Sequence, residues 1–295
     1  MKRRIVSVAS LLVPAVLLTA QTDRITVRMS PAPNQTLHQR TTQVIAMTTE
    51  PKPGGTGALP LVPQAINMTM TMDVTSTVGP PNNQGHYEAR VVCDSASMTA
   101  TLNGQPMPMP QLSTEKAVGQ LFTFTYDDQG KVINVETDGV LAGAAAAALK
   151  QMLTSALATA APFTLSVGET VTVPTLLNVP LPAAAPGGAG GPMTVSGETQ
   201  YTLTSVTFDG ADRIAHLAMK ITSAVNSALP AGGSAPTIAV DIRMTGEGTS
   251  DVNVDRGIVL HKEQRMTVDA STNAEANPRM PNMRGTITLT TDLLR

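Results

Sequence analysis

Aromatic residues are scarce in this chain of 295 residues, which has no tryptophan, three tyrosines and four phenylalanines. Sites for sugars and for single-stranded nucleic acids use aromatic rings as stacking platforms, so this scarcity argues against both ligands. Beyond residues 2–4 the basic residues are dispersed with no run of them, and acidic side chains outnumber basic ones by 22 to 20 in the whole chain. The sequence therefore predicts no nucleic-acid partner.

Cysteine is nearly absent, because Cys93 is the only one. A disulfide framework is thereby excluded, and we expect Cys93 to be a small buried side chain, with a reactive thiol as the alternative. The four histidines share no metal-ligand spacing. A nucleophile elbow, a phosphate-binding glycine loop and a catalytic pair of carboxylates are missing as well. We therefore expect no enzymatic activity, no catalytic residue, no metal and no cofactor.

The N-terminus has the pattern of a secretory signal peptide. A basic start at residues 2–4 precedes an apolar run over residues 5–18, and Thr19 and Ala20 offer small residues for cleavage. A single N-terminal membrane anchor is the alternative, but the run is short for a span and contains Pro14. We expect residues 1–20 to be removed and residues 21–295 to be exported, to the periplasm or the extracellular space, with no stable membrane span.

Long stretches of alternating apolar and polar residues predict β-strands. Residues 238–254 place apolar or small residues at every even position, and residues 66–78 repeat the pattern. We also expect strands at residues 163–173, 194–208, 214–222, 258–268 and 283–293. Changes of parity predict bulges near Asp94 and Ser205, and Asp/Gly turns such as residues 127–130 and 255–257 predict hairpins.

Residues 140–161 are the one convincing helix in the sequence. Asp138 is suited to cap its start, alanines favour it, and Pro162 ends it. An apolar stripe recurs every four residues, at Leu141, Ala145, Leu149, Leu153 and Leu157. A membrane span is the alternative, but the alanines and hydroxyl side chains give little transfer energy, so we favour a helix packed on a sheet.

The predicted fold class is α+β, mainly β. We expect a long, curved, half-barrel-like antiparallel sheet with one alanine-rich helix packed on it. Residues 21–295 would form a single β-rich domain, with halves at residues 21–138 and 163–295 joined by the helix.

Several short motifs in the second half carry a resemblance to a known group. They are Gly168-Glu169-Thr170-Val171, the strand from Tyr201 to Val206, Gly246-Glu247-Gly248 and Asp255-Arg256-Gly257. These motifs, spread over residues 163–294, resemble a family of exported bacterial proteins known as a domain of unknown function. That family is similar in layout to the half-barrel carrier lipoproteins of the cell envelope. The resemblance implies a fold and an envelope location, and it brings no catalytic residue.

Methionine is abundant, with sixteen in the chain, and three alternate along one predicted strand. Met68, Met70 and Met72 would share a face, where they either fill an aromatic-poor core or bind Cu(I), a soft ion that thioethers accept. Core packing is the simpler interpretation. The residues that we expect to line a ligand cavity are Met68, Met70, Met72, Leu149, Leu153, Ile242 and Met244.

Two polar patterns have competing interpretations. Lys262 and Gln264 share parity with apolar neighbours, so either the middle of their strand leaves the core or they line a partly wet cavity. Asp251, Asn253 and Asp255 resemble half of a calcium loop, but Arg256 and Lys262 occupy positions that need glycine and a bidentate acid. A solvated strand edge is the better explanation for these acids.

The function that the sequence favours is an exported, non-enzymatic protein that binds a lipid, another apolar ligand or an envelope partner in the hollow of a curved sheet. One alternative is a periplasmic Cu(I)-handling protein that uses the methionine strand. Another is a purely structural envelope protein whose core is filled.

Overall fold

The computed structural model describes residues 24–50, 63–107, 118–138, 162–180, 192–229, 238–272 and 282–294. Every regular element in these ranges is a β-strand, so the expected α+β class is wrong for the described chain, which is all-β. No helix capable of crossing a membrane occurs in these ranges. The helix expected over residues 140–161 and the signal peptide expected over residues 1–20 lie outside the described residues.

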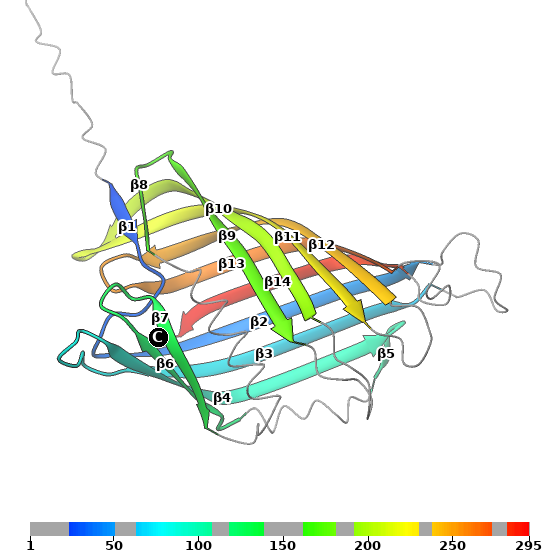
Figure 1. Ribbon diagram of the computed structural model, residues 1–295, viewed down its shortest axis with the longest axis horizontal. Helices are drawn as coiled ribbons and strands as arrows, with labels where there is room; N and C mark the ends of the chain where they lie inside the picture. Colours follow the sequence, from blue (N-terminus) through cyan, green and yellow to red (C-terminus); the bar gives the residue numbers. More distant parts are fainter. Residues whose placement is uncertain are drawn as a thin grey trace, which may run out of the picture.

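The strands form one large sheet and one small ribbon (Figure 1). The ribbon pairs β1 (Ile25–Val27) with β8 (Phe163–Leu165). The large sheet contains β2 (Gln35–Glu50), β3 (Ala65–Val78), β4 (Tyr87–Leu102), β5 (Gln105–Pro106), β6 (Leu121–Tyr126), β7 (Val132–Asp138), β9 (Thr170–Pro180), β10 (Pro192–Asp209), β11 (Asp212–Leu229), β12 (Ile238–Asn253), β13 (Ile258–Thr272) and β14 (Asn282–Leu294).

Alternating side chains produce these long strands where the sequence predicts them, and both expected bulges are confirmed. The register between β3 and β4 shifts beside Asp94, and that between β10 and β11 shifts between Leu203 and Ser205. The single strand expected over residues 163–173 is wrong. Gly168 has a φ of 85° in a turn that separates β8 from β9, and the two strands belong to different sheets.

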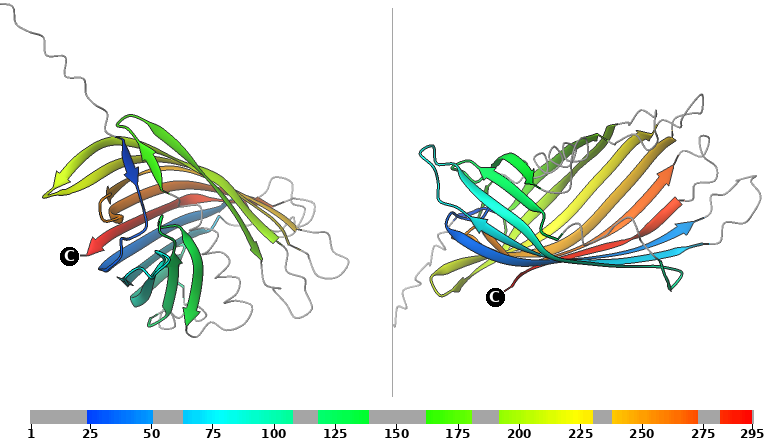
Figure 2. Two further views of the ribbon diagram at one scale, coloured as in Figure 1. Left: turned by 60° about the vertical axis from the view of Figure 1, so that its left-hand side comes forward. Right: turned by 90° about the horizontal axis from the view of Figure 1, so that it is seen from below.

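All neighbouring strands of the large sheet are antiparallel, in the order β7-β6-β4-β3-β2-β14-β13-β12-β11-β10-β9. The pairing of β14 with β2 joins strands from the two ends of the chain in the middle of the sheet. The path ends at β7 and β9, so the sheet is not closed into a barrel. Figure 2 shows that the sheet is curved, with its edge strands β9 and β7 turning toward the same side.

The two faces of the large sheet differ in chemistry. We call the side that carries Met70 the inner face. Directly opposed residues of adjacent strands point to the same side of a sheet, so this face can be traced from strand to strand. One such row is Met70, Gln43, Leu289, Gln264, Gly248, Met219 and Tyr201. The opposite side, the polar face, carries threonines and charged residues such as Arg40, Asp73 and Glu247.

Two buried clusters lie on the inner face. In the first, the ribbon contributes Ile25, Val27 and Leu165, which pack against Leu203 and Leu217 of the sheet. In the second, at the β3–β4 and β6–β7 corner, the rings of Tyr87 and Tyr126 stack with centroids 5.1 Å apart. The first cluster also contains Val252, near the end of β12, so the ribbon covers the inner face beside the β12–β13 turn.

The expectation for Cys93 is confirmed, because its side chain is buried. Burial raises the pKa of its thiol, and the nearby carboxylates of Asp94 and Asp73 add to that increase. A thiol with a raised pKa forms little thiolate at neutral pH, so this cysteine is a structural residue.

Candidate functional site

The predicted cavity residues fall into two separated groups on the inner face. Met68, Met70 and Met72 lie on β3, whereas Ile242 and Met244 lie on β12. Strands β2, β14 and β13 stand between the two groups, which places them roughly 19 Å apart at ~4.8 Å per strand. Leu149 and Leu153 lie outside the described residues. The cavity interpretation of all seven residues stays a prediction.

Residues that the sequence did not single out connect the two groups. Met70 lies directly opposite Met98, and Met68 lies opposite Ile45. Ile45 pairs with Ile287 of β14, which pairs in turn with Met266 of β13. The register therefore brings methionines from seven strands onto one face, namely Met47, Met68, Met70, Met72, Met98, Met219, Met244, Met266 and Met283. Most of these side chains are half-buried, whereas Met219 is buried. Unbranched thioether chains suit an apolar surface that adapts to what it contacts.

A polar row crosses this apolar face beside the ribbon. Lys262 pairs with Ser250 on β12 and with Thr291 on β14, and Thr291 pairs with Thr41 on β2. The next row places Gln264 opposite Leu289. We call Thr41, Ser250, Lys262, Gln264 and Thr291 the polar row cluster.

Within the polar row cluster, Lys262 is poorly compensated. None of the ion pairs among the described residues includes it, and burial lowers the pKa of its ammonium group below the usual value. The side chain is only partly exposed. Of the two interpretations drawn from the sequence, a strand that leaves the core is wrong, because Gln264 is only 8% exposed.

The other members of the polar row cluster are only weakly bonded. The amide Nε2 of Gln264 donates to the sulfur of Met219 at 3.8 Å, and the hydroxyls of Thr41 and Thr291 are 3.4 Å apart. Ser250 is 1% exposed, and its hydroxyl has no hydrogen-bond partner among the described residues. Polar groups that are buried with few partners cost stability, which is typical of sites prepared for a ligand.

On the polar face, charged side chains pair across strands. Arg40 binds Asp73 at 2.7 Å, and Arg284 binds Asp269 at 2.6 Å. The acids of the calcium-like sequence are also paired, because Asp251 lies 2.7 Å from His216 and Asp255 binds Arg213. The Arg213 guanidinium and backbone N–H hold the pKa of Asp255 below its usual value. These acids therefore pair with basic side chains of β11 on the surface of the sheet.

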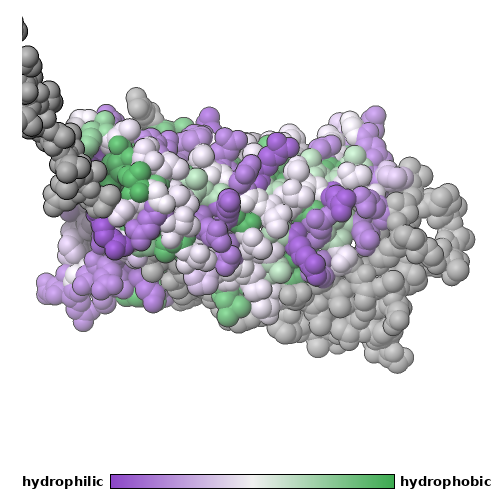
Figure 3. Space-filling model, turned by 90° about the horizontal axis from the view of Figure 1, so that it is seen from above, coloured by the Kyte–Doolittle hydropathy of each residue, from purple (hydrophilic) through white to green (hydrophobic). Residues whose placement is uncertain are grey.

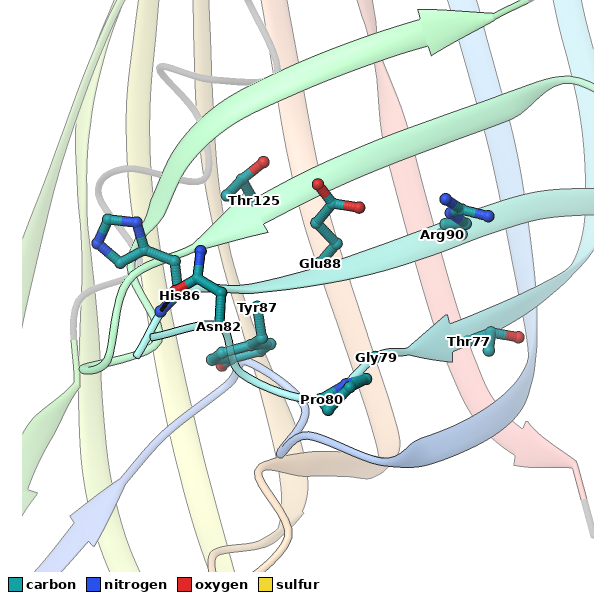
Figure 4. Close-up of a pocket in the computed structure, with 9 residues that line it drawn as sticks. All are labelled: Thr77, Gly79, Pro80, Asn82, His86, Tyr87, Glu88, Arg90 and Thr125. Atoms are coloured by element: carbon teal, nitrogen blue, oxygen red, sulfur yellow. Dashed lines mark hydrogen bonds between the residues drawn. The ribbon is translucent and has the colours of Figure 1, made fainter. Parts of the chain in front are cut away.

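The cleft in Figure 4 is a second candidate site, with a volume of about 380 Å³. Glu88 and Arg90 project from β4, and His86 and Asn82 belong to the β3–β4 turn. The Asn82 carboxamide oxygen accepts the backbone N–H groups of Gln84 and His86, so it shapes the turn. Glu88 is the only carboxylate among the lining residues, so this cleft offers no pair of acids for catalysis.

Larger clefts, with charged residues among those that line them, open on the polar face. One of about 420 Å³ contains Arg243, Asp269 and Arg284. The face shown in Figure 3 mixes hydrophilic residues with small, separate apolar ones. The inner face carries the methionine side chains and both buried clusters, and we take it as the candidate site.

Metal binding by the usual ligands finds no support in the geometry. In the part of the chain that the structure describes, no group of three or more histidine, cysteine, aspartate or glutamate side chains could hold a metal ion. The thioether alternative stays a prediction, to which the register adds Met98 directly opposite Met70.

Comparison with known proteins gives no further identification. No model of a known protein family matches the chain, and a search of curated proteins gives no significant match. The candidate site is therefore defined by its own geometry, as a largely apolar inner face with polar side chains gathered around Lys262.

Proposed function

We propose that this protein is an exported, non-enzymatic binding protein that holds an apolar ligand on the inner face of its curved sheet. The observation that carries the proposal is the set of half-buried methionine and aliphatic side chains spread over seven neighbouring strands of an open sheet. The ribbon packs on one end of this face, near Leu203 and Leu217.

Physical chemistry supports a ligand on such a surface. The apolar face of a sheet is stable when another layer covers it, and soluble proteins rarely leave large contiguous apolar patches uncovered. Burying such surface releases about 25 cal/mol for each Å² removed from water. Methionine side chains change rotamer at low cost, so they accommodate ligands of irregular shape. The proposed address outside the cytoplasm is supported by the N-terminal sequence pattern alone.

The proposal predicts that Met70→Gln weakens binding of Nile red, a neutral apolar dye, by about tenfold, which corresponds to ~1.4 kcal/mol. Met70 lies in the middle of the inner face, opposite Met98, so a carboxamide there would have to lose water when the dye binds. Dye fluorescence against protein concentration measures the affinity.

The matched control is Thr71→Gln, which places the same carboxamide on the polar face of the same strand. This variant should bind Nile red as the unmodified protein does. Equal weakening by the two substitutions, or no saturable dye binding at all, would contradict the proposal.

A further inference from the structure

The polar row cluster interrupts the apolar inner face at one defined place. Lys262 lies opposite Ser250 and Thr291, and no carboxylate on the described inner face compensates its charge. Ser250 is almost fully buried with an unpartnered hydroxyl. A cation and hydroxyl donors in apolar surroundings are suited to bind an anionic group with several oxygens. A carboxylate is such a group, because it accepts several hydrogen bonds at once.

The surroundings of Lys262 give the site a direction. Toward the β12–β13 turn, the core formed by the ribbon occupies the inner face, with Val252 fully buried and Val259 packed against it. In the opposite direction along β13, the inner-face side chains are Gln264, Met266, Val268 and Ala270. A strand rises ~3.3 Å per residue, so this path is on the order of 26 Å long. Gln264 and Val268 are already buried on this path, whereas Met266 and Ala270 are half-buried and available to contact an extended alkyl chain.

We propose that the ligand is a long-chain fatty acid, whose carboxylate lies at Lys262 and whose alkyl chain runs along β13 toward Ala270. This inference rests on the proposed function and names the class of ligand. The carboxylate meets Lys262, the one cation without an ion pair on the inner face of the described strands, together with the hydroxyls beside it. The chain covers the half-buried methionines of the neighbouring strands.

Desolvation explains why the head group matters for affinity. Burial lowers the pKa of Lys262, which shows that its surroundings disfavour an isolated positive charge. A carboxylate beside the ammonium supplies the missing opposite charge, whereas an alcohol of the same chain length supplies none. The difference in affinity between acid and alcohol is therefore assigned to this one residue.

The experiment compares parinaric acid, a fluorescent fatty acid, with the alcohol made from it. We expect the unmodified protein to bind the acid at least tenfold more tightly than the alcohol. Lys262→Met should remove this preference, because methionine keeps the apolar contacts of the lysine stem and lacks its charge. Lys262→Gln is measured as a second variant and should lose the preference in the same way, so that the test does not depend on one variant folding.

The control is Lys220→Met, which removes a lysine from the polar face, opposite Glu247, and should keep the full preference. A preference that survives in both Lys262 variants overturns this inference, as does an unmodified protein that binds acid and alcohol equally. Absence of binding of either probe instead overturns the proposed function.

Discussion

Gly285→Ala should lower the free energy of unfolding by about 3 kcal/mol, at the upper end of the range for overpacked substitutions. Gly285 lies on the inner face of β14, opposite Met47 of β2. A Cβ atom at this position would lie 2.1 Å from the carbonyl oxygen of Ala46 and 2.8 Å from the Cα of Met47. Backbone cannot retreat as a side-chain tip can, so the two central strands would have to separate. Chemical denaturation of the purified variant measures the loss.

Gly79→Ala is the matched control for this substitution. A Cβ atom there would meet only the carbonyl oxygen of Glu88 at 3.7 Å, an ordinary contact. Alanine also restricts the unfolded chain, so we expect an unchanged or slightly increased stability. Equal stability of the Gly285 and Gly79 variants would show that the close approach of β14 to β2 does not exist. Glycines on the inner face allow a sheet to coil, so this pair of variants tests its curvature.

Raising the pH from 9 to 11 should destabilise the protein by ~1.4 kcal/mol through Tyr126 alone. Burial raises the pKa of Tyr126 to about 12, and Tyr87, stacked on it, adds to the increase. An unfolded tyrosine loses its proton near pH 10, so between pH 10 and pH 12 the unfolded state binds fewer protons than the folded state. Linkage therefore removes stability as the pH rises through this window.

Urea denaturation at pH 9 and pH 11 measures this effect. Tyr126→Phe should show a smaller alkaline loss, with the remainder due to Tyr87 and Tyr201, whose pKa values are also raised by burial. The chain has no tryptophan, so the absorbance of tyrosinate follows the titration directly. If the variant loses as much free energy of unfolding between pH 9 and pH 11 as the unmodified protein, Tyr126 is not buried in the cluster that it forms with Tyr87.

Local pattern was sufficient to predict much of the sheet. Alternation at residues 238–254 is seen as β12, and the parity changes near Asp94 and Ser205 mark real bulges. Both features depend on neighbours in sequence. The split of residues 163–173 was missed because a left-handed turn at Gly168 does not interrupt the alternation enough to be recognised. The strand order was also missed, because β14 and β2 are distant in sequence and pair through tertiary contacts.

The candidate site shows the same division between local and long-range information. Met68, Met70 and Met72 share a face because they alternate on one strand, which the sequence predicts. That Met98 and Met266 lie on the same face depends on the register of five strands, and no local sequence pattern contains that register. Parity in the sequence marks Lys262 as an exception, but its position beside Ser250 and Thr291 follows only from the pairing of the surrounding strands.

Methionine-methyl NMR with a fatty acid that carries a doxyl spin label near the end of its alkyl chain tests the account most directly. The proposed pose places the label near Ala270 and far from Lys262, so the methyl signals of Met244, Met266 and Met283 should broaden on addition of the ligand. The signal of Met29, which packs against the ribbon core, should stay sharp. Broadening of Met29 without the inner-face methionines, or no selective broadening at saturating ligand, would contradict the binding of a fatty acid on the inner face.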